Sequence, residues 1–244
     1  MRSGNPVLNA KTFENIGTSE EVMTLEGTVN KTVLLLLIVV VAASWTWDQT
    51  LNAVSPAEIV PYILVGALGA FIVGLITIFA KQYSGYTAPV YAVLEGLAIG
   101  AISAIFEMKY SGIVLQAVGL TFGTLFSMLA IYKSGLIKPT ENFKLGVVSA
   151  TGGIAVLYLI DIALTFFLGK PIAFIHEGGL FGILFSVFVV IIAALNLVLD
   201  FDFIESGVEN GSPKYMEWYG AFGLLVTLIW LYLEILRLLA KSRK

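Results

Sequence analysis

Seven separate runs of mainly apolar residues occupy most of the sequence, and short polar turns connect them. A helix needs about 20 such residues to cross the hydrocarbon core of a bilayer. Lipid offers the backbone no hydrogen bonds, so a spanning segment must satisfy its own, as a helix does. The sequence therefore predicts an all-α polytopic membrane protein with seven transmembrane helices. The expected spans are residues 32–51, 56–80, 87–106, 113–132, 144–168, 178–200 and 215–240.

Composition supports this class, because only 13% of the residues are charged. An ordinary soluble domain carries about 25%, and the smaller number here cannot coat a water-facing surface. We expect a polar N-terminal tail of residues 1–31, a transmembrane domain of residues 32–240 and a basic C-terminal tail of residues 241–244. The N-terminal tail contains glutamates and no apolar core, so we do not interpret it as a signal peptide.

Several kinds of chemistry are excluded by the residues that the sequence lacks. It contains no cysteine, and His176 is its one histidine, so thiolate and multi-histidine metal sites are excluded. No nucleotide-binding loop and no serine or zinc hydrolase motif is present. The basic residues are scattered, which argues against nucleic acid as a partner. We therefore expect no enzyme and no bound cofactor, and we interpret His176 as an ordinary loop histidine.

Lysines and arginines predict the orientation, because cytoplasmic loops carry an excess of them. Their distribution places the N-terminus and the loop of residues 133–144 in the cytoplasm. Seven spans would put the basic C-terminal tail outside, against this bias. Either the tail is an exception or one apolar run is re-entrant, and we favour seven spans.

Small residues recur at every fourth position in four of the expected spans. This spacing puts a flat stripe on one helix face and lets two backbones approach closely. We interpret the stripes as packing surfaces within a dense bundle. They are Gly66/Ala70/Gly74, Gly96/Gly100/Ala104, Gly119/Gly123/Ser127 and Gly178/Gly182/Ser186.

Six acidic residues lie within or at the borders of the apolar spans, where a charge is costly. The only basic residue deep in the last four expected helices is Arg237, one turn past Glu234. Carboxylates without a counter-charge must share protons, bind cations or stay neutral. We therefore predict a gate or cation-binding function for these acids. They are Glu95, Asp161, Asp200, Asp202, Glu217 and Glu234.

The helical rise of 1.5 Å per residue sorts the acids by depth. The sorting predicts an inner layer of Glu95, Asp200, Asp202 and Glu217. It predicts an outer layer of Asp161 and Glu234. Calcium takes six to eight oxygen ligands, so we name Asp200 and Glu95 as candidate Ca²⁺ ligands.

Five segments of the sequence carry a resemblance to a known family. They are "TLEGTVNKT", "APVYAVLEGLAIGAISAIFE", "ATGGIAVLYLI", "AALNLVLDFDFIE" and "EWYGAFGLLVTLIWLYLEILRLLAK". Together they resemble the bacterial branch of the Bax-inhibitor (transmembrane Bax-inhibitor-motif) family. The resemblance implies a last helix wrapped by two three-helix layers. It also implies a pH-sensitive calcium leak that an aspartate pair on the last two helices gates. Asp200 matches the first aspartate. "LYLE" offers Glu234 for the second, whereas an alignment without a gap places Thr227 there.

The sequence thus leads to a pH-sensitive calcium or cation leak channel gated by intramembrane carboxylates. The alternative is a regulatory membrane protein that binds a membrane protease or a stress or cell-death regulator, with purely structural acids. The expected partners are the lipid bilayer and Ca²⁺ or H⁺, with a membrane-protein partner in the alternative. The expected location is the bacterial plasma (inner) membrane.

Overall fold

The computed structural model describes residues 21–243, which contain eight α-helices and no β-strand. Seven of these helices are long and apolar enough to cross a membrane, which confirms the all-α polytopic class. The helices are α1 (Leu25–Asn52), α2 (Pro56–Phe79), α3 (Ser84–Lys109), α4 (Ile113–Lys133), α5 (Glu141–Leu168), α6 (Ala173–His176), α7 (Leu180–Glu209) and α8 (Met216–Ser242), with a 3₁₀ turn η2 (Lys81–Tyr83) before α3.

The helices extend beyond the apolar runs at several ends, because capping residues rather than hydropathy decide where a helix begins. Helix α1 begins at Leu25, where the Thr24 side chain accepts a hydrogen bond from the Gly27 N–H. Residues 25–31 are therefore helical and not part of a tail as expected, and residues 1–20 lie outside the described residues. At the other end, Lys241 was expected in a basic tail but lies buried in α8.

Helix α7 does not end at Asp200, as the apolar run suggested, but continues to Glu209. Asp200 and Asp202 therefore lie inside a helix rather than at its C-terminal end. Gly211, with a φ of 62°, lies in the turn that follows. Pro213 also lies in this connection before α8, where it forms an isolated antiparallel bridge with Val22.

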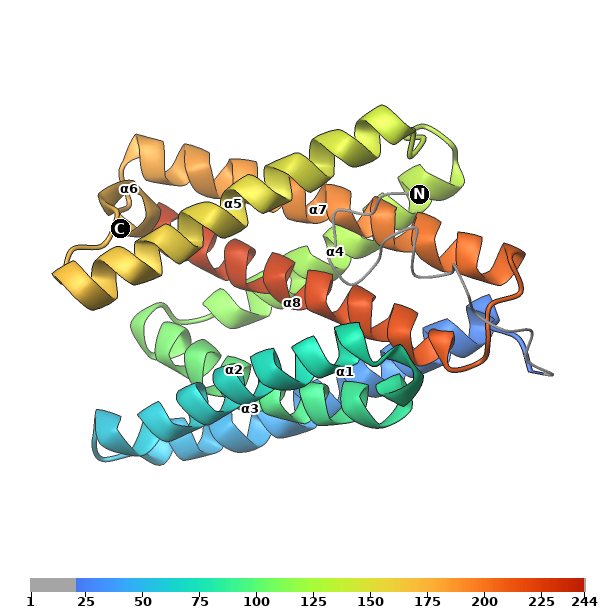
Figure 1. Ribbon diagram of the computed structural model, residues 1–244. Helices are drawn as coiled ribbons and strands as arrows, with labels where there is room; N and C mark the ends of the chain where they lie inside the picture. The colour runs from blue at the N-terminus through green and yellow to red at the C-terminus, as the bar shows by residue number, and fades with distance from the viewer. Residues whose placement is uncertain (1–20, 244) are drawn as a thin grey trace. The chain divides into compact units, whose positions relative to one another are not determined.

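The described residues form two compact units, and α7 and α8 each contribute to both. One unit consists of residues 21–111 and 203–225. Within it α3 packs along both α1 and α2 (Figure 1). A Cβ added to Gly100 would lie 2.1 Å from the Thr46 hydroxyl, and one added to Gly66 would lie 2.7 Å from the Leu94 carbonyl oxygen. Close helix packing at the first two small-residue stripes is therefore confirmed.

The other unit consists of residues 112–202 and 226–243. Its core includes Ile154 of α5 and Val189 and Ile192 of α7, against which Trp230 of α8 packs. The third stripe does not pack as expected, because Gly119 and Gly123 have no neighbouring atom within 4 Å of an added Cβ. The last stripe also differs. Gly178 precedes α7, and Gly182 packs against the backbone of Phe174 and Glu177.

Helix α8 is the most buried span. In the apolar window of α8, 67% of the residues are buried, against 17% in α2 and α5. The acids that α8 carries therefore need partners within the protein.

Candidate functional site

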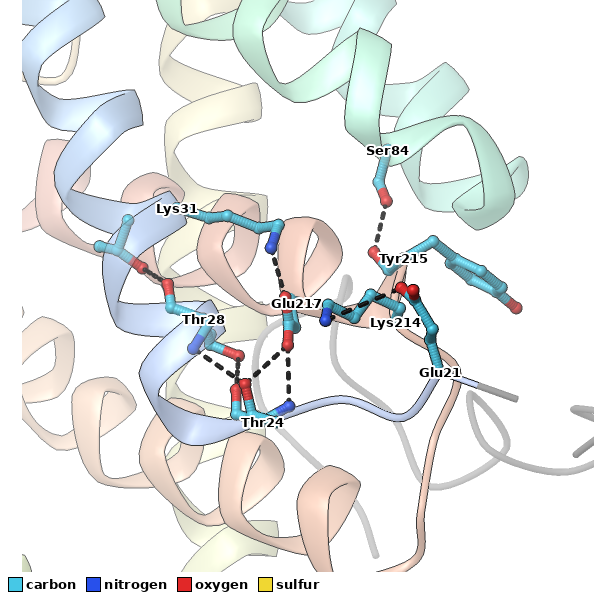
Figure 2. A network of polar contacts seen from close by, with 10 residues as sticks. Glu21, Thr24, Thr28, Lys31, Ser84, Lys214, Tyr215 and Glu217 are labelled. Carbon is cyan, nitrogen blue, oxygen red and sulfur yellow. Dashed lines mark hydrogen bonds and ion pairs between the residues drawn. The ribbon is translucent and has the colours of Figure 1, made fainter. Parts of the chain in front are cut away.

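Glu217, in the first turn of α8, is fully buried. Its carboxylate accepts hydrogen bonds from two residues at the start of α1, Thr24 and Lys31. Its Oε1 accepts the Thr24 backbone N–H at 2.9 Å and the Thr24 hydroxyl at 2.8 Å. Its Oε2 is paired with the Lys31 ammonium (Figure 2). The carboxylate thus lies at the N-terminal end of two helices, where both helix dipoles favour negative charge.

The fit around Glu217 depends on a glycine in α1. A Cβ added to Gly27 would lie 2.2 Å from Glu217 Oε1, closer than real atoms approach. Any other residue at this position would force the carboxylate to move. The Lys31 ammonium also lies 5.5 Å from the centre of the Trp218 ring, within cation–π range.

Asp202 of α7 is paired with Lys144 of α5, with 2.7 Å between Oδ2 and Nζ. Glu141, at 3.8 Å from the same ammonium, is a more distant partner on its own helix. The Lys144 side chain is only 6% exposed, so its charge is held by these two acids. Asp202 is therefore neutralised by a neighbouring helix.

Asp161 of α5 is bonded to two residues that follow in the chain, one just before α6 and one at its end. One carboxylate oxygen accepts the Ile172 N–H at 2.7 Å, and the other lies 2.7 Å from His176 Nε2. The Asp161 side chain is 9% exposed, whereas the His176 side chain is 52% exposed. Asp161 thus ties a partly exposed histidine to a buried helix position.

Glu234 of α8 belongs to a three-residue network. Its Oε1 accepts hydrogen bonds from the Tyr158 hydroxyl and from Arg237 Nη1, both at 2.8 Å. Arg237 also donates to the Tyr158 oxygen and lies over its ring. Glu234 Oε2 is buried and takes no hydrogen bond from the described residues. Neither oxygen of Glu234 is hydrogen-bonded to Asp200.

Glu95 differs from these four acids, because its side chain has no hydrogen bond or ion pair within residues 21–243. It lies well inside α3 and is partly buried. Tyr91, one turn earlier on the same face of α3, packs edge-on against Phe222 of α8, with 4.9 Å between ring centres. The Glu95 carboxylate therefore lies on a helix face that is directed toward α8.

Asp200 is the most deeply buried of the six acids together with Glu217, since its exposed fraction is 0%. It lies in a continuous stretch of buried α7 residues from Leu197 to Phe201. The residues that the structure describes contain no group of three or more His, Asp or Glu side chains that could hold a metal. A calcium ion at Asp200 or Glu95 would therefore need hydroxyl, carbonyl or water oxygens as further ligands.

Comparison with known families matches residues 5–244 to the family described as Bax inhibitor 1 like. The chain belongs to the Bax inhibitor 1 like family. The match covers essentially the whole sequence and agrees with the resemblance of its five segments. No curated protein and no solved structure matches the chain significantly.

The expectation that this Bax inhibitor 1 like protein lacks counter-charges for its acids, apart from Arg237 beside Glu234, was wrong for Glu217 and Asp202. Three of the six acids pair with a lysine or an arginine, a fourth lies against His176, and three of these four partners come from another helix. The partners are Lys31 for Glu217, Lys144 for Asp202, His176 for Asp161 and Arg237 for Glu234. Sequence reasoning treated the two lysines as orientation markers at helix ends and His176 as an ordinary loop residue.

One sequence signal could have identified these partners. Lysine side chains at helix borders are long and can reach back along the helix to a buried acid. Lys31 and Lys144 both lie near such borders, within the first two turns of α1 and the first turn of α5. Which acid each would reach depends on the packing of distant segments, which the local pattern does not contain.

Proposed function

We propose that this protein is a pH-sensitive cation leak pathway of its membrane, with calcium as the transported cation. Two findings support an integral multi-pass membrane protein: the chain belongs to the Bax inhibitor 1 like family, and it has seven apolar helices. The proposal assigns no catalytic step and no bound cofactor to the chain. It assigns the bacterial plasma membrane as its location.

The observation that carries the proposal is the isolation of Glu95. A carboxylate inside an apolar span that has no basic partner must bind a proton or attract a cation. Glu95 has no such partner among residues 21–243, and its helix face is directed toward α8 by Tyr91 and Phe222. Asp202, Asp161, Glu217 and Glu234 have partners, which makes them less available to a passing cation.

Asp200 supplies the second part of the proposal, the response to pH. Asp200 is fully buried in α7, so a proton can reach its carboxylate only when the residues around it rearrange. Such a residue can couple proton concentration to the arrangement of α7. We assign Asp200 to the gate and Glu95 to the cation route.

Calcium flux into proteoliposomes across a pH series tests the gate. We expect Asp200→Asn to abolish or shift the dependence of flux on pH while the protein stays folded. Asp48→Asn, at the exposed end of α1, is the matched control and should retain the wild-type curve. Identical curves for wild type and Asp200→Asn would remove Asp200 from the gate.

A second candidate function is regulation of a membrane protease or of a stress or cell-death regulator. The observation that favours it is the open stripe on α4, where Gly119 and Gly123 are exposed and an added Cβ would have no atom of the described residues within 4 Å. Small residues on a helix face allow another transmembrane helix to approach closely. Under this candidate the acids are structural, and Gly119→Leu would abolish partner capture without changing cation flux.

A further inference from the structure

Residues 21–31, which we call the latch segment, are fastened to the connection between α7 and α8. The Met23 N–H donates to the Ser212 carbonyl at 2.7 Å, and the Lys214 N–H donates to the Glu21 carbonyl at 3.0 Å. Between these bonds, Val22 and Pro213 form an antiparallel bridge. The Met23 side chain is buried. A short ladder of two backbone hydrogen bonds therefore holds the latch segment against the connection that precedes α8.

Besides this ladder, Thr24 and Lys31 of the latch segment both contact one side chain, Glu217. Thr24 contributes two hydrogen bonds and Lys31 an ion pair, and no hydrogen bond to Glu217 comes from α2 or α3 (Figure 2). Loss of this single carboxylate would cancel three contacts at once. Gly27 has no side chain, which lets α1 approach this carboxylate closely. Release of the latch segment would break these contacts together with the ladder, and a segment with a closed and an open arrangement is a two-state element.

Stability alone does not account for a buried ion pair at this place. Replacing such a pair with apolar residues is often neutral or stabilising, because the desolvation of two charges offsets their attraction. Removing one partner, in contrast, leaves a buried charge and is strongly destabilising. A role in a switch therefore explains the ion pair of Lys31 and Glu217 better than a gain in folding stability does.

We propose that the latch segment regulates the cation leak by covering and neutralising Glu217. When the latch is closed, the Lys31 ammonium cancels the charge of the acid at the beginning of α8. When it is open, Glu217 presents an uncompensated carboxylate that raises the local concentration of cations. This regulatory role rests on the proposed leak function, whereas the opening of the latch does not.

Thiol labelling measures the opening without reference to transport. Ser212 is buried beneath the closed segment, and the chain has no native cysteine, so Ser212→Cys provides a single reporter. Adding Lys31→Gln should raise its labelling rate on the order of tenfold, since a buried carboxylate loses its counter-charge. Lys138→Gln removes an exposed lysine of the α4–α5 connection and should leave the rate unchanged. An unchanged rate with Lys31→Gln would overturn the latch.

A disulfide tests the regulation. The bridge pattern makes Val22 and Pro213 a non-hydrogen-bonded pair, whose Cα atoms are about 4.5 Å apart. This spacing suits a disulfide. Oxidised Val22→Cys/Pro213→Cys protein should leak less calcium in proteoliposomes than the same protein after reduction. Lys31→Gln should leak more than wild type, and Lys31→Gln/Glu217→Gln should not.

The outcomes separate the two proposals. Equal flux in the oxidised and reduced forms of a leaking protein would overturn the regulatory role of the latch. No flux in any form, including wild type, would overturn the leak function and with it the regulation. In that case the labelling rate of Ser212→Cys still decides whether the latch segment opens.

Discussion

The Lys144 ammonium of α5 lies 2.7 Å from the Asp202 carboxylate of α7. Lys144 is nearly buried, with only the more distant Glu141 as a second acid. Asp202→Asn should therefore destabilise the protein by about 2 kcal/mol, because it leaves a buried ammonium with weak compensation. Thermal unfolding in detergent measures the loss.

A double variant provides the control for this pair. Lys144→Met/Asp202→Asn removes both charges and should recover most of the stability that Asp202→Asn loses, as coupled residues do in a mutant cycle. Strictly additive losses would show that the two side chains do not interact.

Gly27→Ala should destabilise the start of α1 by roughly 2 kcal/mol or more, because overpacking a tight site forces its neighbours to move. The added Cβ would lie 2.2 Å from Glu217 Oε1. The matched control is Gly146→Ala, an exposed helical glycine of α5 with no atom within 4 Å of an added Cβ. This control should be neutral or stabilising, since alanine favours a helix over glycine. Equal unfolding temperatures for the two variants would contradict the close contact of Gly27 and Glu217.

Tyr158→Phe removes the hydroxyl that donates to Glu234 and accepts from Arg237. The loss leaves a buried carboxylate with one donor fewer, which should cost about 1–3 kcal/mol. Tyr86→Phe, at a tyrosine that is 80% exposed, should cost nothing measurable. The unfolding temperatures of the two variants decide whether the Tyr158 hydroxyl supports the network.

Single cysteines test the orientation, since no native cysteine interferes. A cysteine at Lys138 should react with a membrane-impermeant thiol reagent only from the cytoplasmic side, and a cysteine at Lys109 only from the opposite side. Seven spans further require a cysteine at Arg243 to react from the side of Lys109. Labelling of residue 243 from the cytoplasmic side would show that one apolar run is re-entrant.

The sequence was sufficient to predict the seven spans, because the hydrophobicity of each run is a local property. The ends of α1 and α7 were not predictable from hydropathy, since they depend on the Thr24 cap and on a polar helical continuation to Glu209. Two small-residue stripes with the same spacing also differ in whether another helix packs against them. The stripe of Gly96 and Gly100 packs against α1, whereas that of Gly119 and Gly123 is open.

The six acids were identified from the sequence, but their partners were not. Lys31 and Glu217 are separated by 186 positions, so only the packing of α1 against α8 shows that they meet. Arg237, three residues from Glu234, was visible because the pair lies within one helix. Pairing at short range follows from helical spacing, whereas pairing at long range requires the fold.

The calcium flux of Glu95→Gln in proteoliposomes tests the proposed function most directly. The substitution keeps the shape of the side chain and removes a carboxylate that lies inside α3 and has no basic partner among residues 21–243. We expect a clear loss of flux with unchanged or slightly higher thermal stability, because a carboxylate without a counter-charge has been neutralised. Asp48→Asn, near the exposed C-terminal end of α1, should retain the wild-type flux. A Glu95→Gln protein that conducts calcium like wild type would contradict the cation route and favour the regulatory membrane protein.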